Sequence, residues 1–350
     1  MKLEIKLLLV EDDPSDRQGF EQSVTRFNHE NGANFTVVAF DTLQATLDKL
    51  DSSFDCAVID MKLGDQGGEG NKILEVLDKA NFRMPVVVLT GTPDEADSEF
   101  VHIDVKKKGD AEHSEILKDF HQVHSSGLTK VMGGRGIIEK SLSKVFRHNL
   151  LSQKNAWKAY GQLDSERSER ALMRHVMNHL ISMVDMEEEN CFPEEFYIHP
   201  PVDEGLRTGS VVRAKDRSEF FVVLTPLCDL TKRHDGEFNA RKVMLCRISA
   251  LEECYEELPE SKNNSKGRAA LRKNLLSNAK GSYHFLPNTD FFDGGYLDFE
   301  NLTSIPKSQF NDHFSAPSLQ ISPAFIKDIV ARFSAYFGRQ GQPVLTQPSE

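Results

Sequence analysis

The sequence lacks paired cysteines, long apolar runs and long runs of cations, and each absence argues against a class of protein. Its five cysteines are odd in number, scattered and never spaced as C-x-x-C. This pattern favours reduced thiols over a disulfide framework or a structural zinc site. Nowhere do about 18 apolar residues follow one another, and the apolar run near the start is too short for a signal peptide. We therefore expect a cytoplasmic protein without a membrane span.

The charge of the chain argues against nucleic acid as its main partner. The formal net charge is −12, and no long Lys/Arg run offsets it. Such a chain repels a phosphate backbone, and no helix-turn-helix pattern is evident near the C-terminus. DNA binding is therefore unlikely on sequence grounds. The 350 residues, 39% of them hydrophobic, are enough for two domains with separate cores.

In the first third of the chain, short apolar runs alternate with segments of helical period. We expect strands at residues 6–10, 35–40, 56–60, 85–90 and 101–105, each followed by a helix. The first helix is predicted to start at Asp13-Pro14, an N-cap acid followed by proline. Continuous β-branched runs suit strands that are buried on both faces, so the alternation predicts a parallel, doubly wound α/β sheet.

Residue composition and periodicity divide the rest of the chain into three further parts. After a first domain at 1–124, the small residues of 125–136 indicate a linker. Residues 137–195 are compatible with a helical connector, which could hold a homodimer together. From 196 to 350, short strands with turns and a final helix at 323–337 predict a β-rich domain, either a small barrel or an α+β fold.

Polar side chains follow the predicted strands of the first domain at the point where each strand ends. Three acids at 11–13 follow the first strand, and Asp60 ends the third. Thr90 ends the fourth strand, and three lysines at 106–108 end the fifth. Because ligands bind beyond the carboxyl ends of such strands, where the strand order reverses, we expect chemistry at this edge.

These residue types suit the binding and transfer of a phosphoryl group. Magnesium is a hard cation that prefers oxygen ligands, so two or three carboxylates suffice to hold it. A carboxylate can also act as a nucleophile and form an acyl phosphate. The transition state of phosphoryl transfer spreads negative charge over three oxygens, which a metal ion, a lysine and a hydroxyl group can stabilise.

Residues 5–122 resemble the receiver domain of the response regulators of bacterial two-component signalling. The resemblance rests on "LLLVEDDPSDR", "AVIDMKLGDQGGEG", "PVVVLTGT" and a lysine after the fifth strand. It implies a flavodoxin-like fold with a five-stranded sheet. It also implies phosphorylation on an aspartate, with Mg²⁺, by a cognate histidine kinase or phosphotransfer protein.

The same resemblance implies a role for each polar residue. Asp60 would be the phosphoacceptor, and Thr90 would bond a phosphoryl oxygen. Glu11 and Asp12 would bind Mg²⁺ together with Asp60 and the backbone carbonyl of Lys62. The carboxylate of Asp60 would thus be both the phosphoacceptor and a ligand of the metal ion.

The lysine of the site has two candidates. The alternation of apolar residues favours Lys106, whereas the spacing to the last helix and the run Lys-Gly-Asp favour Lys108. We favour Lys108 and keep Lys106 as the alternative. The chain also departs from the family, because Gly109 stands where a proline is common. The interval from Thr90 to Lys108 is short as well, which predicts a trimmed or irregular fourth helix and an unusual coupling to the output.

Two further motifs each leave two interpretations open. Cys228 next to Asp229, with His234 following, could form a Cys-His nucleophile, or Cys228 could be a small buried thiol. His175 and His179 have the i, i+4 spacing of a helical metal pair, or they belong to a solvated helix end.

Together these features predict an atypical response regulator whose C-terminal domain binds a protein partner. One alternative is an effector enzyme that the receiver-like domain controls. Another is a phosphate sink in a branched phosphorelay, as in a bacterial stress or antiviral system.

Overall fold

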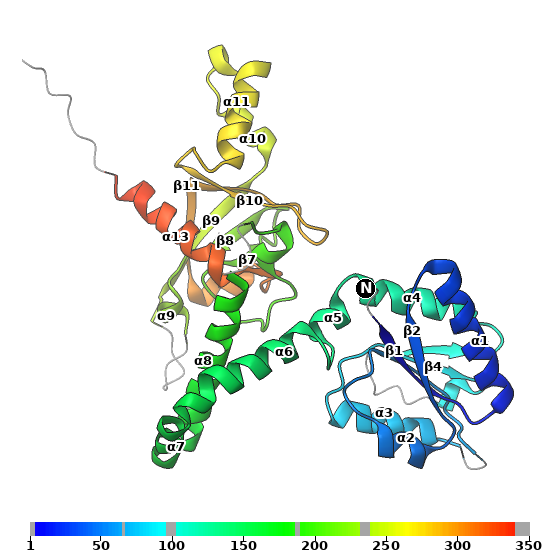
Figure 1. The fold of residues 1–350 in the computed structure, drawn as a ribbon. Coiled ribbons are helices and arrows are strands. Elements are labelled where there is room, and N and C mark those ends of the chain that lie inside the picture. The colour runs from blue at the N-terminus through cyan, green and yellow to red at the C-terminus, as the bar shows by residue number, and fades with distance from the viewer. Residues whose placement is uncertain (1–3, 65–66, 96–102, 186–189, 232–238, 340–350) are drawn as a thin grey trace, which may run out of the picture. The chain divides into compact units, whose positions relative to one another are not determined.

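The computed structural model describes residues 4–64, 67–95, 103–185, 190–231 and 239–339. The chain forms two compact units, Met1–Glu187 and Glu188–Glu350 (Figure 1). All five cysteines are free. Within the described ranges, no helix is both long and apolar enough to cross a membrane.

The first unit contains a parallel sheet whose strand order reverses between its first and third strands. The five strands lie in the order β2-β1-β3-β4-β5. They are β1 Ile5–Val10, β2 Phe35–Phe40, β3 Cys56–Ile59, β4 Val86–Thr90 and β5 Ile103–Lys107. The alternation of strands and helices predicted a parallel, doubly wound sheet, and the family resemblance implied this flavodoxin-like fold.

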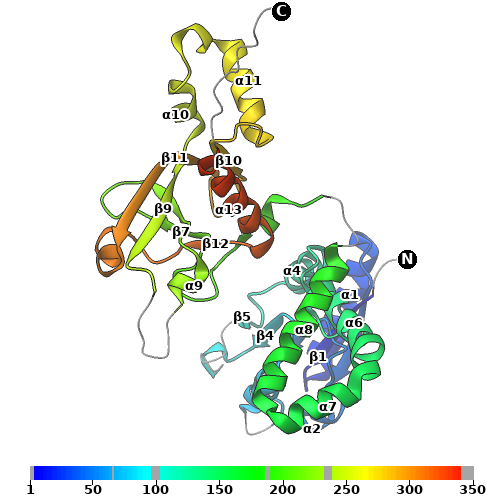
Figure 2. The ribbon, with the colours of Figure 1, turned by 90° about the vertical axis from the view of Figure 1, so that its left-hand side faces the viewer.

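Helices cover both faces of this sheet (Figures 1 and 2). They are α1 Pro14–Asn31, α2 Leu43–Lys49, α3 Glu69–Lys79 and α4 His113–Ser125. Leu7 and Leu9 of β1 share one core with side chains of α1 and α4. Leu8 and Val10 share the other core with side chains of α3. The continuous apolar run of β1 is thereby explained, because each successive side chain enters the opposite core.

The start of α1 is as predicted. The side chain of Asp13 accepts hydrogen bonds from the backbone N–H groups of Ser15, at 2.7 Å, and Asp16, at 3.1 Å. Between β4 and β5, the described part contains the 3₁₀ turn η1, Pro93–Glu95. Residues 96–102, where a trimmed fourth helix and the start of the fifth strand were expected, lie outside the described residues.

A series of helical segments follows α4. It comprises α5 Leu128–Met132, α6 Ile137–Lys144, the π-helical η2 Val145–Leu150, the 3₁₀ turn η3 Leu151–Gln153, α7 Lys154–Leu163 and α8 Ser165–Asp185. Helices α7 and α8 contact each other as a hairpin. The predicted helical connector thus consists of α-helices that are interrupted by a π-helical segment and a 3₁₀ turn.

The glycine-rich stretch before α6 is packed against the sheet domain. A Cβ atom on Gly134 would lie 2.0 Å from the carbonyl oxygen of Ser52. The guanidinium group of Arg135 forms an ion pair with the buried carboxylate of Asp55 and a second one, at 3.6 Å, with Glu4. The small residues here allow close contact between two backbone segments.

The second unit is built on a curled antiparallel sheet of seven strands that forms a half-barrel (Figure 1). The strand order is β10-β11-β9-β8-β7-β12-β6. The strands are β6 Tyr197–Ile198, β7 Ser210–Arg213, β8 Phe220–Val223, β9 Lys242–Ser249, β10 Tyr283–Leu286, β11 Gly295–Pro306 and β12 Leu319–Ile321. The sequence predicted a β-rich domain here, but β6 and β12 are too short to show an alternating pattern.

Short helices complete this unit. They are α9 Leu227–Leu230, α10 Leu251–Glu256, α11 Ser265–Leu276, α12 Phe310–His313 and α13 Pro323–Phe337, with 3₁₀ turns η4 Pro193–Phe196, η5 Glu260–Lys262 and η6 Lys307–Gln309. Helix α13 covers one face of the sheet, where Ile329 is fully buried and the rings of Phe333 and Phe299 lie 5.6 Å apart. Helices α10 and α11 project from the sheet (Figures 1 and 2).

We expect Gly134→Ala to lower the free energy of unfolding by about 1–3 kcal/mol, because the new methyl group would overlap the Ser52 carbonyl group. Gly161→Ala in α7 is the control, since a Cβ there meets nothing closer than 4.0 Å. Denaturant unfolding of both variants measures the effect. Equal stability of the two variants would show that the stretch is not held against the sheet domain.

Candidate functional site

The candidate site lies where the strands β1, β3, β4 and β5 end. The backbone N–H of Asp60 donates to the carbonyl group of Val10, at 2.9 Å, just beyond β3. The backbone N–H of Lys108 likewise donates to the carbonyl group of Thr90, at 2.9 Å, just beyond β5. The sheet hydrogen bonding therefore continues past the strand ends and holds the backbone of the site.

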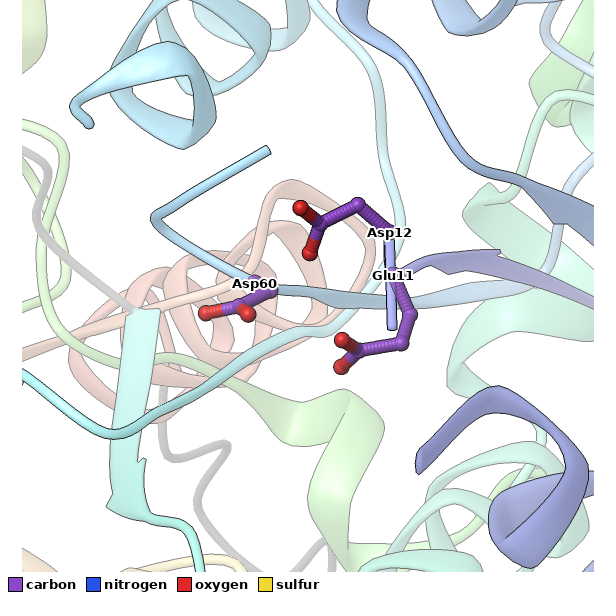
Figure 3. Close-up of side chains that lie close together, drawn as sticks. All are labelled: Glu11, Asp12 and Asp60. Atoms are coloured by element: carbon purple, nitrogen blue, oxygen red, sulfur yellow. The ribbon is translucent and has the colours of Figure 1, made fainter. Parts of the chain in front are cut away.

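Three carboxylates meet at this edge. One side-chain oxygen each of Glu11, Asp12 and Asp60 lies within 4.8 Å of the other two (Figure 3). Glu11 is 5% exposed and Asp60 is 6% exposed. Two of the three acids are therefore withdrawn from water, where their negative charges need compensation.

Lys108 supplies a compensating charge. Its ammonium nitrogen Nζ lies 2.8 Å from Asp60 Oδ2, 2.7 Å from Glu11 Oε2 and 3.0 Å from Asp16 Oδ2. The ammonium group of Lys106 is instead 3.3 Å from a surface aspartate of its own strand. The structure thus brings Lys108 into the acidic cluster and leaves Lys106 outside it.

The electrostatics of the cluster follow from burial and from these contacts. Burial raises the pKa of Glu11, the charge of Asp60 raises it further, and Lys108 offsets part of the effect. Burial by itself would lower the pKa of Lys108, but its hydrogen bonds to Asp60, Glu11 and Asp16 outweigh this and raise that pKa above its ordinary value. Lys108 is therefore a fixed positive charge, and Glu11 is a carboxylate held in an unfavourable environment.

The loop after β3 lies over the acids. The backbone N–H of Gly64 donates to Asp12 Oδ2 at 2.9 Å, and that of Lys62 lies 3.5 Å from Asp60 Oδ1. Thr90, which is 1% exposed, ends the neighbouring strand β4 and accepts a hydrogen bond from the backbone N–H of Thr92 at 3.2 Å. A hydroxyl group and backbone donors thus accompany the carboxylates.

Sequence reasoning missed two residues of this site. Asp16, in the first turn of α1, is the third carboxylate bound to Lys108. Gly70, in the first turn of α3, would place a Cβ atom 2.6 Å from the carbonyl oxygen of Asp60, so only glycine fits there. An acid in the first turn of a helix that starts at the site could have indicated Asp16, whereas the contact of Gly70 depends on how α3 packs.

The donor set fits a small divalent cation. Three carboxylates within reach of one point are hard oxygen ligands of the kind that Mg²⁺ prefers. The negative charges also outnumber the single ammonium group of Lys108 among them. A metal ion at this edge would reduce the remaining repulsion between the buried acids.

Neither of the other two candidate motifs shows a comparable cluster of metal-ligating side chains among the described residues. The Nε2 atoms of His175 and His179 lie 3.1 Å apart on α8. Within the described residues, no third metal-ligating side chain joins them. Cys228 is exposed, so the expectation of a small buried thiol was wrong, because α9 carries the residue away from the sheet after β8 ends. His234 lies outside the described residues.

Comparisons with known proteins bear on the first unit. No family model and no curated protein matches this chain. Among solved structures, a response regulator receiver protein from Pseudoalteromonas atlantica is 16% identical, with a TM-score of 0.29, and the match covers 35% of this chain and 98% of that one. A receiver domain protein from Bacillus halodurans is 20% identical, with a TM-score of 0.27, and the match covers 34% and 97%.

A third similar structure is the receiver domain of a Francisella response regulator, which is 22% identical with a TM-score of 0.26. The match covers 35% of this chain and 98% of that one. The matches to response regulator receiver domains fall on the N-terminal third of the chain, where the motifs of that resemblance lie.

We expect Lys108→Met to lower the free energy of unfolding by about 2 kcal/mol near neutral pH, because it leaves Glu11 and Asp60 buried without a cation. Lys106→Met is the control and should cost at most about 0.5 kcal/mol, since its ion pair is exposed to water. Denaturant unfolding in the presence of a chelator measures both values. Equal losses would contradict the assignment of Lys108 to the cluster.

The pH dependence of this effect has a predicted sign. The pKa of Glu11 is raised in the folded state above its ordinary value of 4.5. Its contribution to stability is therefore favourable below that value and is lost as the pH rises through the folded-state pKa. The destabilisation by Lys108→Met should shrink as the pH is lowered from neutral towards 4.5. A loss that stays constant over this range would argue against Glu11 as the titrating group.

Proposed function

We propose that this protein is an atypical response regulator that is phosphorylated on Asp60, with Mg²⁺, by a partner histidine kinase or phosphotransfer protein. The observation that carries the proposal is the buried carboxylate of Asp60, 2.8 Å from the Lys108 ammonium group and beside Glu11 and Asp12. The resemblance of residues 5–122 to receiver domains agrees with this chemistry.

In the proposed reaction, a carboxylate oxygen of Asp60 attacks the phosphorus atom of a phosphohistidine. The new O–P bond forms as the P–N bond breaks, and the imidazole nitrogen of the partner retains the electron pair and takes up a proton. Lys108, which stays protonated, is placed to pair with a phosphoryl oxygen next to Asp60. The Thr90 hydroxyl group would donate to another phosphoryl oxygen.

The acids of the site would hold the metal ion that this chemistry requires. Glu11, Asp12 and Asp60, with the backbone carbonyl group of Lys62, would be its ligands. When bound, Mg²⁺ supplies positive charge against the phosphoryl oxygens. The hydrogen bond from Gly64 to Asp12 orients that carboxylate towards the cluster.

The output would pass through a change in the contacts of Lys108. Phosphorylation replaces the single negative charge of the Asp60 carboxylate with the two charges of a phosphoryl group, which compete with Glu11 and Asp16 for the Lys108 ammonium group. Because Lys108 directly follows β5, its movement would shift the end of that strand. We assign the C-terminal unit to binding a protein partner in the cytoplasm, and we regard DNA as an unlikely partner.

We expect one phosphoryl group to be added when the full chain is incubated with a small phosphodonor, such as acetyl phosphate, and Mg²⁺. Intact-mass spectrometry should detect it, and the linkage should be lost in base, as for an acyl phosphate. Asp60→Asn should abolish the modification, whereas Asp13→Asn, which alters an acid that caps α1, should retain it. An unmodified wild-type protein, under conditions that label an ordinary receiver domain, would refute the proposal.

We expect Mg²⁺ to raise the melting temperature of the protein, because a ligand that binds only the folded state stabilises it, by about 2.7 kcal/mol at a hundred times its dissociation constant. Asp12→Asn should raise the Mg²⁺ concentration that is needed for the same rise in melting temperature about tenfold or more, since it removes one negative ligand. Asp13→Asn again serves as the control. Equal Mg²⁺ dependence in wild type and Asp12→Asn would place the metal elsewhere.

A further inference from the structure

The hairpin of α10 and α11 separates negative from positive charge along the chain. Residues 251–260 contain five glutamates and no cation. Residues 261–288 contain six lysines and arginines and no acid. In a protein of net charge −12, this places an isolated basic segment on a hairpin that projects from the sheet (Figure 1).

The acids of α10 do not neutralise the cations of α11. Glu253 is bound to an arginine of β9, at 3.0 Å, and Glu257, directly after α10, accepts a hydrogen bond from a tyrosine of β10. Among the described residues, no ion pair is formed by Lys266, Arg272 or Lys273, all of which are exposed. The positive charges of these three residues therefore face solvent without an ion-pair partner among the described residues.

Arg272 and Lys273, but not Lys266, border an open groove of about 700 Å³ along α11. Its lining includes Tyr255, Arg268, Ala269, Arg272, Lys273 and Leu276. The lining positions of α11 recur every three or four residues, so they form one helical face, while Leu271 and Leu275 are buried on another. The groove thus alternates apolar and basic groups along its length.

Two of the lining groups are already fixed in place. The guanidinium group of Arg268 lies 5.4 Å from the ring centre of Tyr255 and donates to Asn263 Oδ1 at 2.7 Å. Leu276, at the end of α11, is 45% exposed, so its side chain is accessible from the groove. A preformed aromatic and cationic wall lowers the entropy cost of binding.

We propose that this groove binds an acidic amphipathic helix of a partner protein. Apolar side chains of that helix would contact Ala269 and Leu276, and its acidic side chains would pair with Arg272 and Lys273. The 12 residues of α11 span about 18 Å, which matches a partner helix of three to four turns. The proposal does not depend on phosphorylation of Asp60.

The surroundings of the groove favour a short acidic helix over the other anionic partners. Five acids precede the six cations, so the hairpin from 251 to 280 has a net charge of only 6 − 5 = +1. A nucleic-acid strand extends well beyond one helix and would meet these acids and the negative field of the whole chain. The same acids would also face an anionic membrane surface and oppose its binding.

The test uses the full chain and a labelled synthetic helix of about 15 residues, with leucines on one face and glutamates flanking them. Fluorescence anisotropy should show saturable binding. A scrambled peptide of the same composition should bind about tenfold more weakly, because it keeps the charge but not the apolar face. Equal binding of the two peptides would overturn the proposal.

Variants of the chain locate the site. Arg272→Glu with Lys273→Glu should weaken binding about tenfold or more. Lys262→Glu with Lys266→Glu makes the same change in charge outside the groove lining and should change affinity by less than about threefold. Leu276→Ser should weaken binding without any change in charge. Circular dichroism and denaturant unfolding verify that each variant is folded.

Three outcomes would contradict the proposal. The first is that both charge-reversal variants lose affinity equally. The second is that a single-stranded oligonucleotide or anionic phospholipid vesicles bind more tightly than the amphipathic peptide. The third is that the free chain self-associates and that Arg272→Glu with Lys273→Glu dissociates it, which would assign the groove to a second copy of the chain.

Discussion

The contact of the Lys108 ammonium group with several carboxylates stabilises the cluster of acids at the carboxyl edge of the first sheet. Glu11 and Asp60 are almost fully buried, and like charges at this separation would repel each other strongly in a low dielectric. Lys108 reaches both of them, but only because β5 lies beside β4 and the hydrogen bond to Thr90 fixes where the chain turns. The register of the sheet therefore decides whether the buried acids are paired with Lys108 or destabilise the fold by their mutual repulsion.

A third buried carboxylate is neutralised at the other end of β3, the strand that leads to Asp60. Asp55 directly precedes β3 and pairs with Arg135 of the stretch that leads into the helical segments. Asp60 directly follows β3 and pairs with Lys108. Four buried residues of β3 thus separate a candidate phosphorylation site from the point where the following chain is attached. The acid at each end of β3 depends on an ion pair with a residue far along the chain, which local sequence patterns do not predict.

In the second unit, buried apolar side chains and exposed charged side chains lie in different parts of the fold. Its sheet is apolar on both faces, with one core covered by α13 and another around Phe221 and Phe310. The hairpin of α10 and α11 instead buries only a narrow stripe and exposes its charges. Stability is thereby concentrated in the sheet, while the projecting hairpin carries the chemically distinctive surface.

The sequence by itself determined the order of strands and helices in the first unit and the acid cap of α1. It also grouped Glu11, Asp12 and Asp60. Local periodicity predicts each element, and parallel strands must bring their carboxyl ends to one edge. In the second unit the sequence indicated the longer strands and the final helix. It missed the strands β6 and β12, which have only two and three residues.

Other features were decided only in three dimensions. Which lysine enters the acidic cluster depends on the last residues of β5, where two patterns in the sequence disagree. The stretch 125–136 looks like a linker because it is rich in small residues, yet Gly134 is small because it lies against Ser52. Spacing along the chain specifies local geometry, whereas contacts between residues far apart in sequence depend on how whole elements pack.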